Sequence, residues 1–181
     1  MNNFSGLFLD SGSLEEVEKW NFLIGGVTTN QVILLTKDRV KDIPKRIREI
    51  CEVIGNDKTL SIELPDSEWP FERLIEIGKK YSAISPKNIV IKVPIVTDND
   101  KGLLLINRFA KLGIRTNATI GMNYGQLVMA AEASRGSTNN ETNFISLFWG
   151  RTIESVEKYN ESVRPDLLLK SVKQYLSDHV L

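Results

Sequence analysis

The feature that most constrains the fold of this chain is a regular alternation of short apolar runs with longer amphipathic segments. The runs are rich in Val, Ile, Leu and Phe, as buried strands are, whereas the segments between them repeat their apolar residues every three to four positions, as helices do. Strand starts lie roughly 20 to 35 residues apart, the length of a βαβ repeat. The pattern predicts six strands, at residues 7–9, 24–29, 59–64, 89–93, 116–120 and 144–148.

Helices are predicted between these strands and after the last of them. Ser13 and Glu16 form the S-x-x-E pattern of a capping box before the first helix, and Gly113 is a typical residue for the end of the fourth. The polar stretch 134–142 is expected to be a loop. Because no block of hairpins interrupts the alternation, we expect an α/β fold of parallel strands with helical crossovers. The predicted helices span 14–20, 42–54, 70–81, 98–112, 123–133 and 164–176, and the segment after Arg151 is expected to be helical to the end of the chain.

Composition excludes several classes of function. The 23 basic and 23 acidic residues balance, so no basic excess points to nucleic acid or to an anionic membrane, and no run approaches the ~18 apolar residues of a membrane span. A single cysteine, Cys51, forms no internal disulfide and fits a cytoplasmic location. The single histidine, His179, argues against a Ser-His-Asp triad and against a multi-histidine metal site. We therefore expect no metal, and proton chemistry that uses carboxylates, lysine and water.

Polar side chains stand where the predicted strands end, although a buried sheet should avoid them. In parallel α/β folds, ligands bind outside the carboxyl ends of the strands. These residues are therefore expected to form one site. In chain order they are Asp10, Asn30, Glu63, Lys92, Asn117, Thr119, Ser146 and Arg151.

Lys92 is the most informative of these residues because it lies inside an apolar strand. A buried, unpaired ammonium is costly, so the group tends to lose its proton, and a neutral amine attacks carbonyl groups to form a Schiff base. A structural interpretation is also open, in which Lys92 pairs with Glu63 or Asp10 or extends from the strand end to water. Likewise, Asp10 and Glu63 are common as capping or ion-pair residues, and Arg151 could pair with Glu154 at i+3 spacing on a surface.

Together, five stretches resemble the transaldolase and fructose-6-phosphate aldolase family in its short, single-domain form. They are FLDSGSLEEVEKW, GGVTTN, NIVIKVPI, TNATIGMNYGQ and, more weakly, FISLFWGR. The resemblance implies a TIM-type (β/α)8 barrel that forms a Schiff base with a ketose donor. It also implies sugar-phosphate substrates, a homo-oligomer and no organic cofactor, with no nucleic-acid or membrane partner.

The resemblance assigns catalytic roles to four residues. Lys92, in IKVP, is the Schiff-base lysine. Glu63 and Thr119 look like the pair that holds the water for proton transfer. Asp10 is the aspartate after the first strand, which contacts substrate hydroxyls.

Five further residues are assigned to substrate binding. Asn30 closes VTTN and orients the donor, and Asn117 precedes Thr119 as in transaldolases. Ser146 and Arg151 look like the serine and the phosphate-binding arginine of the motif S-P-F-V-G-R. Phe148, together with Glu63, favours transfer over aldol cleavage, because the aldolase branch tends to carry Tyr and Gln at these positions.

The chain also departs from the family pattern. Gln31 replaces the proline of VTTNP, and Leu147 and Trp149 replace two residues of S-P-F-V-G-R. Only six of eight βα units are recognisable, so we expect a single domain over 1–181 that lacks the last two. Because six strands leave open sheet edges, we expect either further residues after Leu181 or an oligomer that covers them. Two alternatives to a transaldolase stay open: an aldolase-type lyase, and a non-catalytic sugar-phosphate-binding protein on a degraded barrel.

Overall fold

The computed structural model of the chain describes residues 6–95, 99–138, 142–159 and 164–179. The chain divides into two compact units, residues 1–92 and residues 93–181, here called the first unit and the second unit.

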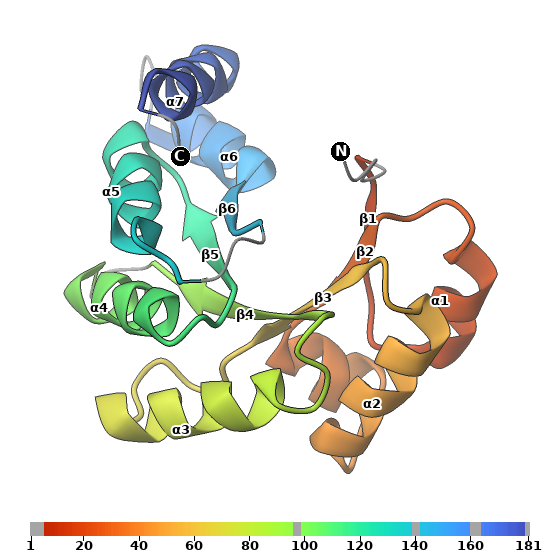
Figure 1. Cartoon of the computed structure of the whole chain (residues 1–181). Helices are drawn as coiled ribbons and strands as arrows, with labels where there is room; N and C mark the ends of the chain where they lie inside the picture. Colours follow the sequence, from red (N-terminus) through yellow and green to blue (C-terminus); the bar gives the residue numbers. More distant parts are fainter. Residues whose placement is uncertain (1–5, 96–98, 139–141, 160–163, 180–181) are drawn as a thin grey trace. The chain divides into compact units, whose positions relative to one another are not determined.

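Parallel strands form the centre of the first unit (Figure 1). They are β1 (Phe8–Asp10), β2 (Gly26–Thr29), β3 (Thr59–Glu63) and β4 (Ile89–Pro94), whose last two residues enter the second unit. Each strand pairs with the next one in the chain, and the register places Asp10 opposite Thr28 and Glu63 opposite Lys92. Polar residues at the carboxyl ends of neighbouring strands are therefore brought side by side.

Within residues 6–92, the first unit contains four helical elements: α1 (Leu14–Trp20), the π-helix η1 (Ile33–Lys37), α2 (Ile43–Ile54) and α3 (Phe71–Ser82). The predicted cap of α1 is half formed. The Ser13 hydroxyl accepts a hydrogen bond from the Glu16 N–H, but the Glu16 carboxylate accepts one from the Ser11 hydroxyl instead of the Ser13 N–H. The Ser13 N–H donates to Ser11 Oγ at 3.1 Å. Glu16 thus ties the start of α1 to the loop that follows β1.

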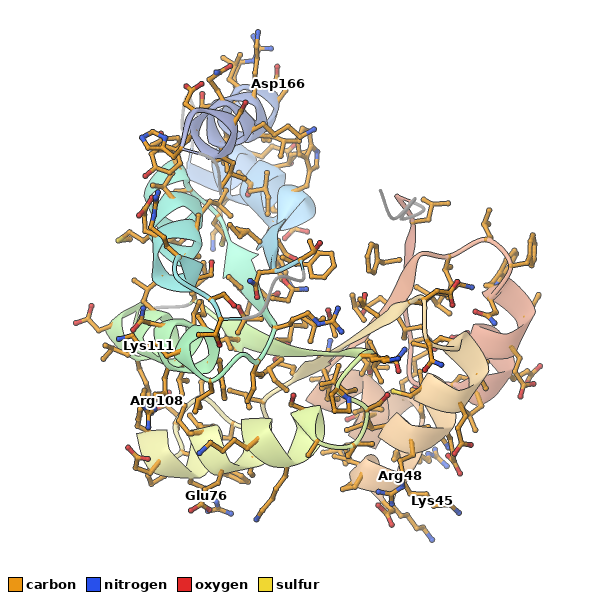
Figure 2. The ribbon with its side chains drawn as sticks, in the orientation of Figure 1. Lys45, Arg48, Glu76, Arg108, Lys111 and Asp166 are labelled. Carbon is orange, nitrogen blue, oxygen red and sulfur yellow. The ribbon has the colours of Figure 1, made fainter. Side chains whose placement is uncertain are left out.

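Apolar side chains from the strands and the inner helix faces form the core of the first unit. Fully buried examples are Val17, Val27, Ile47, Ile50, Leu60, Ile62, Leu74 and Ile91. The opposite helix faces are charged and exposed, as the outward-pointing Lys45 and Arg48 of α2 and Glu76 of α3 illustrate (Figure 2). This division is the amphipathic pattern from which the helices were predicted.

The second unit contains the parallel pair β5 (Thr116–Gly121) and β6 (Phe144–Leu147). Its helices are α4 (Asn99–Lys111), α5 (Tyr124–Ser134), α6 (Trp149–Tyr159) and α7 (Pro165–Asp178). Gly113 follows α4 with a φ of 69°, the left-handed conformation expected for a helix end. Helix α5 packs against both α4 and α7, and a buried cluster of Leu127, Leu168 and Val172 fills the space between α5 and α7.

The strand order in the sheet is β1-β2-β3-β4-β5-β6, the order of the chain. Six parallel strands alternating with helices are the topology of a partial TIM-type (β/α) barrel. All six predicted strands and six predicted helices are confirmed to within two residues, except that Asp98, the predicted first residue of the fourth helix, lies outside the described residues.

Three predictions need correction or completion. The last strand ends at Leu147, and α6 already begins at Trp149, so Arg151 lies in a helix rather than after a strand. The predicted helical segment after Arg151 contains two helices, and residues 160–163 between them lie outside the described residues. In the predicted loop 134–142, Ser134 ends α5, residues 135–138 are irregular, and residues 139–141 lie outside the described residues. The π-helix η1 was not predicted, because its sequence ILLTK has neither the helical nor the strand period.

Candidate functional site

The nine predicted site residues fall into two groups, one in each unit. The first unit contains Asp10, Asn30, Glu63 and Lys92, and the second contains Asn117, Thr119, Ser146, Phe148 and Arg151.

Lys92 and Glu63 form an ion pair at the carboxyl ends of β4 and β3. Lys92 Nζ lies 3.6 Å from Glu63 Oε2 and donates a hydrogen bond to the Thr29 carbonyl oxygen at 3.4 Å. Lys92 is only 7% exposed. The pair follows directly from the strand register, since residues opposite each other on parallel strands are neighbours. The ion pair foreseen as a structural alternative is thus present, and the amine stands at the strand end where α/β folds bind ligands.

The Glu63 carboxyl has a raised pKa. Burial is the largest cause, because a charged carboxylate loses hydration there. The charge and hydrogen bond of Lys92 act in the opposite direction, and the negative charge of Asp10 adds to the increase. A carboxyl whose pKa is moved towards neutrality exchanges protons more readily than an exposed glutamate. Glu63 is therefore suited to acid–base work beside the amine.

Asp10 and Asn30 lie at the ends of β1 and β2 in different settings. Asp10 is exposed, and its Oδ1 accepts a hydrogen bond of 2.7 Å from the Thr28 hydroxyl of β2. Asn30 Oδ1 accepts a hydrogen bond from the Ile33 N–H at 2.9 Å, so this side chain caps the first turn of the segment that contains η1. The structure thus fixes the side-chain oxygens of both residues with hydrogen-bond donors from neighbouring residues.

Two residues that touch this group were missed in the sequence. Thr28 orients Asp10, and Gln31 Nε2 donates a hydrogen bond of 3.1 Å to the Glu63 backbone oxygen. Strand β2 ends at Thr29 and Gln31 is already helical, so the Gln31 side-chain amide reaches the end of β3 just beyond the last paired residues, Thr29 and Ile62. The sequence contained one indication of this role for Gln31. It replaces the proline of VTTNP, which has no N–H, by a side chain with two hydrogen-bond donors.

In the second unit, the polar residues of β5 are buried. Thr119 is completely buried, and its hydroxyl has no hydrogen-bond partner among the residues that the structure describes. Asn117, two residues earlier, is also buried, and its Oδ1 accepts a hydrogen bond of 2.8 Å from the Ser146 hydroxyl of β6. This hydrogen bond joins Asn117 and Ser146 across the pair of strands β5 and β6. An unsatisfied buried hydroxyl is costly, so Thr119 is a candidate for binding water or ligand.

Arg151 lies in the first turn of α6 and points to solvent. Its Nη1 is 3.1 Å from Glu154 Oε2, the i+3 pair foreseen as an alternative. Together with Phe148, Trp149 and Gly150, these two residues line a surface hollow of about 300 Å³. The hollow has room for a small anion at a helix start, where backbone N–H groups favour negative charge. Phosphate binding by Arg151 stays a prediction.

Within residues 6–95, 99–138, 142–159 and 164–179, no group of three or more His, Cys, Asp or Glu side chains could hold a metal ion. No helix in these ranges is long and apolar enough to cross a membrane.

Comparison with known proteins gives consistent results. The family described as transaldolase/fructose-6-phosphate aldolase matches residues 7–178. The chain is 37% identical over 146 residues to a probable transaldolase of Exiguobacterium sp. and 38% identical over 146 residues to one of Bacillus cereus. Both alignments cover 80% of this chain and 60% of the relative. A probable transaldolase of Parabacteroides distasonis is 33% identical over 162 residues, covering 87% of this chain and 67% of the relative. The chain thus spans about 60% of the length of the first two relatives.

Proposed function

Since this chain belongs to the transaldolase/fructose-6-phosphate aldolase family, we propose that it contributes to transfer of a dihydroxyacetone unit between sugar phosphates through a Schiff base at Lys92. The observation that carries the proposal is the buried amine of Lys92 with the Glu63 carboxyl 3.6 Å away. Schiff-base formation needs at least a nucleophile beside a group that can exchange protons.

In the first step, the neutral Lys92 amine attacks the carbonyl carbon of a ketose phosphate. A carbon–nitrogen bond forms, the carbonyl oxygen is protonated, and it leaves as water, so that an iminium ion remains. The Glu63 carboxyl supports the proposal as a proton donor and acceptor, because burial raises its pKa.

In the second step, a base removes the proton of the hydroxyl on the β-carbon, counted from the iminium carbon, and the bond to be broken is the one between the α- and β-carbons. That carbon–carbon bond breaks, an aldehyde phosphate leaves, and the electron pair moves to the iminium nitrogen to give an enamine. The enamine carbon then attacks an acceptor aldehyde, and hydrolysis releases the new ketose. The buried Thr119 hydroxyl, which lacks a partner among the described residues, would bind the water that carries protons.

Transfer is favoured over aldol cleavage by Phe148. A phenyl ring offers no hydroxyl to orient a second water that would hydrolyse the enamine early and release free dihydroxyacetone. Phe148 is half-buried beside the hollow that contains Arg151. In this proposal, Asp10 and Asn30 contact the hydroxyls of the donor, Asn117 and Ser146 lie near the acceptor aldehyde, and Arg151 binds its phosphate.

Trapping with borohydride tests the proposal. The chain is incubated with fructose 6-phosphate and borohydride, and the reduced adduct is located by mass spectrometry. We expect the label on Lys92, its loss in Lys92→Met and its retention in Lys37→Met, a control at an exposed lysine. A label on a different lysine refutes the assignment, and so does the absence of a label in a folded chain. Binding of fructose 6-phosphate by such an unlabelled chain would favour the non-catalytic alternative. Release of free dihydroxyacetone, measured beside transfer to an aldose phosphate, distinguishes lyase from transferase.

A further inference from the structure

The carboxyl end of β5 contains a strained bulge. Ile120 has a φ of 64°, in the left-handed region that β-branched residues avoid. The register with β6 shifts between Ala118 and Gly121, where β5 has one residue more than its partner. A Cβ on Gly121 would lie 2.4 Å from Leu127 Cδ2 and 3.1 Å from the Ser146 carbonyl oxygen, so a side chain there would force its neighbours to move. Strain of this kind persists only where the surroundings impose it.

The side chain of Gln126 closes the bulge into a hydrogen-bonded ring. Gln126 Oε1 accepts a hydrogen bond of 2.9 Å from the Met122 N–H, and Nε2 donates one of 3.2 Å to the Ile95 carbonyl oxygen. The Ile95 N–H in turn donates to the Thr119 carbonyl oxygen at 2.9 Å. Through the Thr119 carbonyl and the Met122 N–H, these three bonds hold the backbone on both sides of Ile120 in place. A return of Ile120 to negative φ would therefore rotate the Thr119 carbonyl away from Ile95.

Capping of the following helix does not explain this arrangement. Asn123 is the N-cap of α5, and its Oδ1 already accepts a hydrogen bond from the backbone N–H of Gln126. In a capping box, the side chain at the position of Gln126 would return to the N–H of the cap residue. Here it bonds Met122, one residue earlier, and spans to Ile95. The side-chain amide of Gln126 therefore stabilises the bulge and does not cap the start of α5.

We infer that Gln126 is a positioning residue, which holds the bulge so that the Thr119 hydroxyl keeps one fixed direction for binding a water or a polar ligand group. Thr119 is fully buried, and its Oγ1 has no hydrogen-bond partner within the described residues. The χ1 rotamer of Thr119 therefore depends on side-chain packing and on the backbone conformation of the bulge. The inference rests on the proposed function, in which that hydroxyl holds the water for proton transfer.

Gln126→Leu tests the inference in the full chain, because leucine has a similar volume but no polar atoms. Gln126→Glu keeps the acceptor for Met122 and loses the donor to Ile95. Asn123→Ala is the matched control, since it weakens the start of the same helix and leaves the Gln126 amide in place. NMR measures two quantities without any need for turnover: the exchange rate of the Met122 amide hydrogen, and the three-bond couplings that report the χ1 rotamer of Thr119.

In Gln126→Leu we expect amide exchange of Met122 to rise at least about tenfold and Thr119 to average between rotamers. The Glu variant should keep the Met122 amide protected, and the Ala control should retain both properties at a comparable melting temperature. A single unchanged Thr119 rotamer in Gln126→Leu overturns the inference, and so does equal averaging in Asn123→Ala.

Kinetics separate this inference from the proposed function. For a wild-type chain that turns over sugar phosphates, Gln126→Leu should lower kcat roughly ten- to hundredfold and change KM less than about twofold, as expected for misplaced proton-transfer machinery. An unchanged kcat overturns the positioning role even if the Met122 amide is released. A wild-type chain that forms no adduct at Lys92 refutes the proposed function, and the NMR experiment still decides whether Gln126 fixes Thr119.

Discussion

Replacement of Lys92 by Met removes the cation that faces Glu63 and leaves the carboxyl in the same buried position. Burial and the charge of Asp10 both raise the pKa of Glu63, and Lys92 opposes them. The variant should therefore have a Glu63 pKa higher than that of the wild-type protein. At the observed 3.6 Å separation, Coulomb's law gives about 1 kcal/mol in bulk water and about 5 kcal/mol at an effective dielectric constant of about 20.

The sign of the effect on stability follows from proton binding. A carboxyl with a raised pKa binds more protons in the folded than in the unfolded state once the pH exceeds its ordinary value of 4.5, so folding free energy is lost as pH rises. Below the ordinary pKa of 4.5, the raised pKa leaves Glu63 mostly protonated in both proteins. There Lys92→Met removes a costly buried ammonium, so the variant should be at least as stable as wild type. Between pH 4 and pH 8 its stability relative to wild type should fall by about 1–5 kcal/mol.

Two measurements check this. Carbon-detected NMR on protein labelled at the glutamate carboxyls gives the direction of the change in the Glu63 pKa, and urea unfolding at pH values from 4 to 8 gives the stability difference. Lys37→Met is the control, because its exposed pair with Glu16 lies at a similar distance, 3.4 Å. Since water screens exposed pairs, this control should show little pH dependence. A stability difference between Lys92→Met and wild type that does not change with pH would refute the reasoning.

Three further predictions concern reaction type and packing. The double variant Phe148→Tyr with Glu63→Gln should raise dihydroxyacetone release relative to transfer; an unchanged ratio of the two rates would contradict the role given to Phe148. Gly121→Ala should destabilise the chain by about 1–3 kcal/mol in urea unfolding, because the new Cβ would lie 2.4 Å from a leucine side chain, and a stability equal to wild type would show that the bulge adapts. Leu168→Ala, at a buried position between α5 and α7, should cost about 2–5 kcal/mol, whereas Leu167→Ala, next to it and half exposed, should cost much less; equal losses would contradict the described packing of α7.

Most of the fold could be predicted because each strand is a short apolar run and each helix buries one face. Where that rule fails, the prediction fails too. The segment containing η1 exposes Leu35 and buries Leu34 within an unbroken apolar run, so its sequence has no readable period. Helix α6 begins with Trp149 and Gly150, which are not typical helix-start residues. The strand was therefore predicted to run through FISLF to Phe148, one residue beyond its end at Leu147.

The site was predictable to the extent that strand register alone determines it. Glu63 and Lys92 end adjacent strands, and the parallel register makes them neighbours. Gln126 and Gln31 could not be found in this way, because each acts through a side-chain bond to backbone atoms about thirty residues away. Such bonds depend on where a strand bends or stops, and a local pattern of apolar residues does not contain that information.

If Arg151 binds the phosphate as proposed, the ion pair between Arg151 and Glu154 makes that binding an exchange of one anion for another. An incoming anion must displace the Glu154 carboxylate, which lies 3.1 Å from the Arg151 guanidinium. Because exposed pairs contribute only about 0–1 kcal/mol, the exchange weakens binding by less than about tenfold. The displacement of Glu154 costs a monoanion and a dianion the same free energy. In the proposed site, a preference for a phosphate dianion would therefore come from its second charge and from the backbone N–H groups at the start of α6.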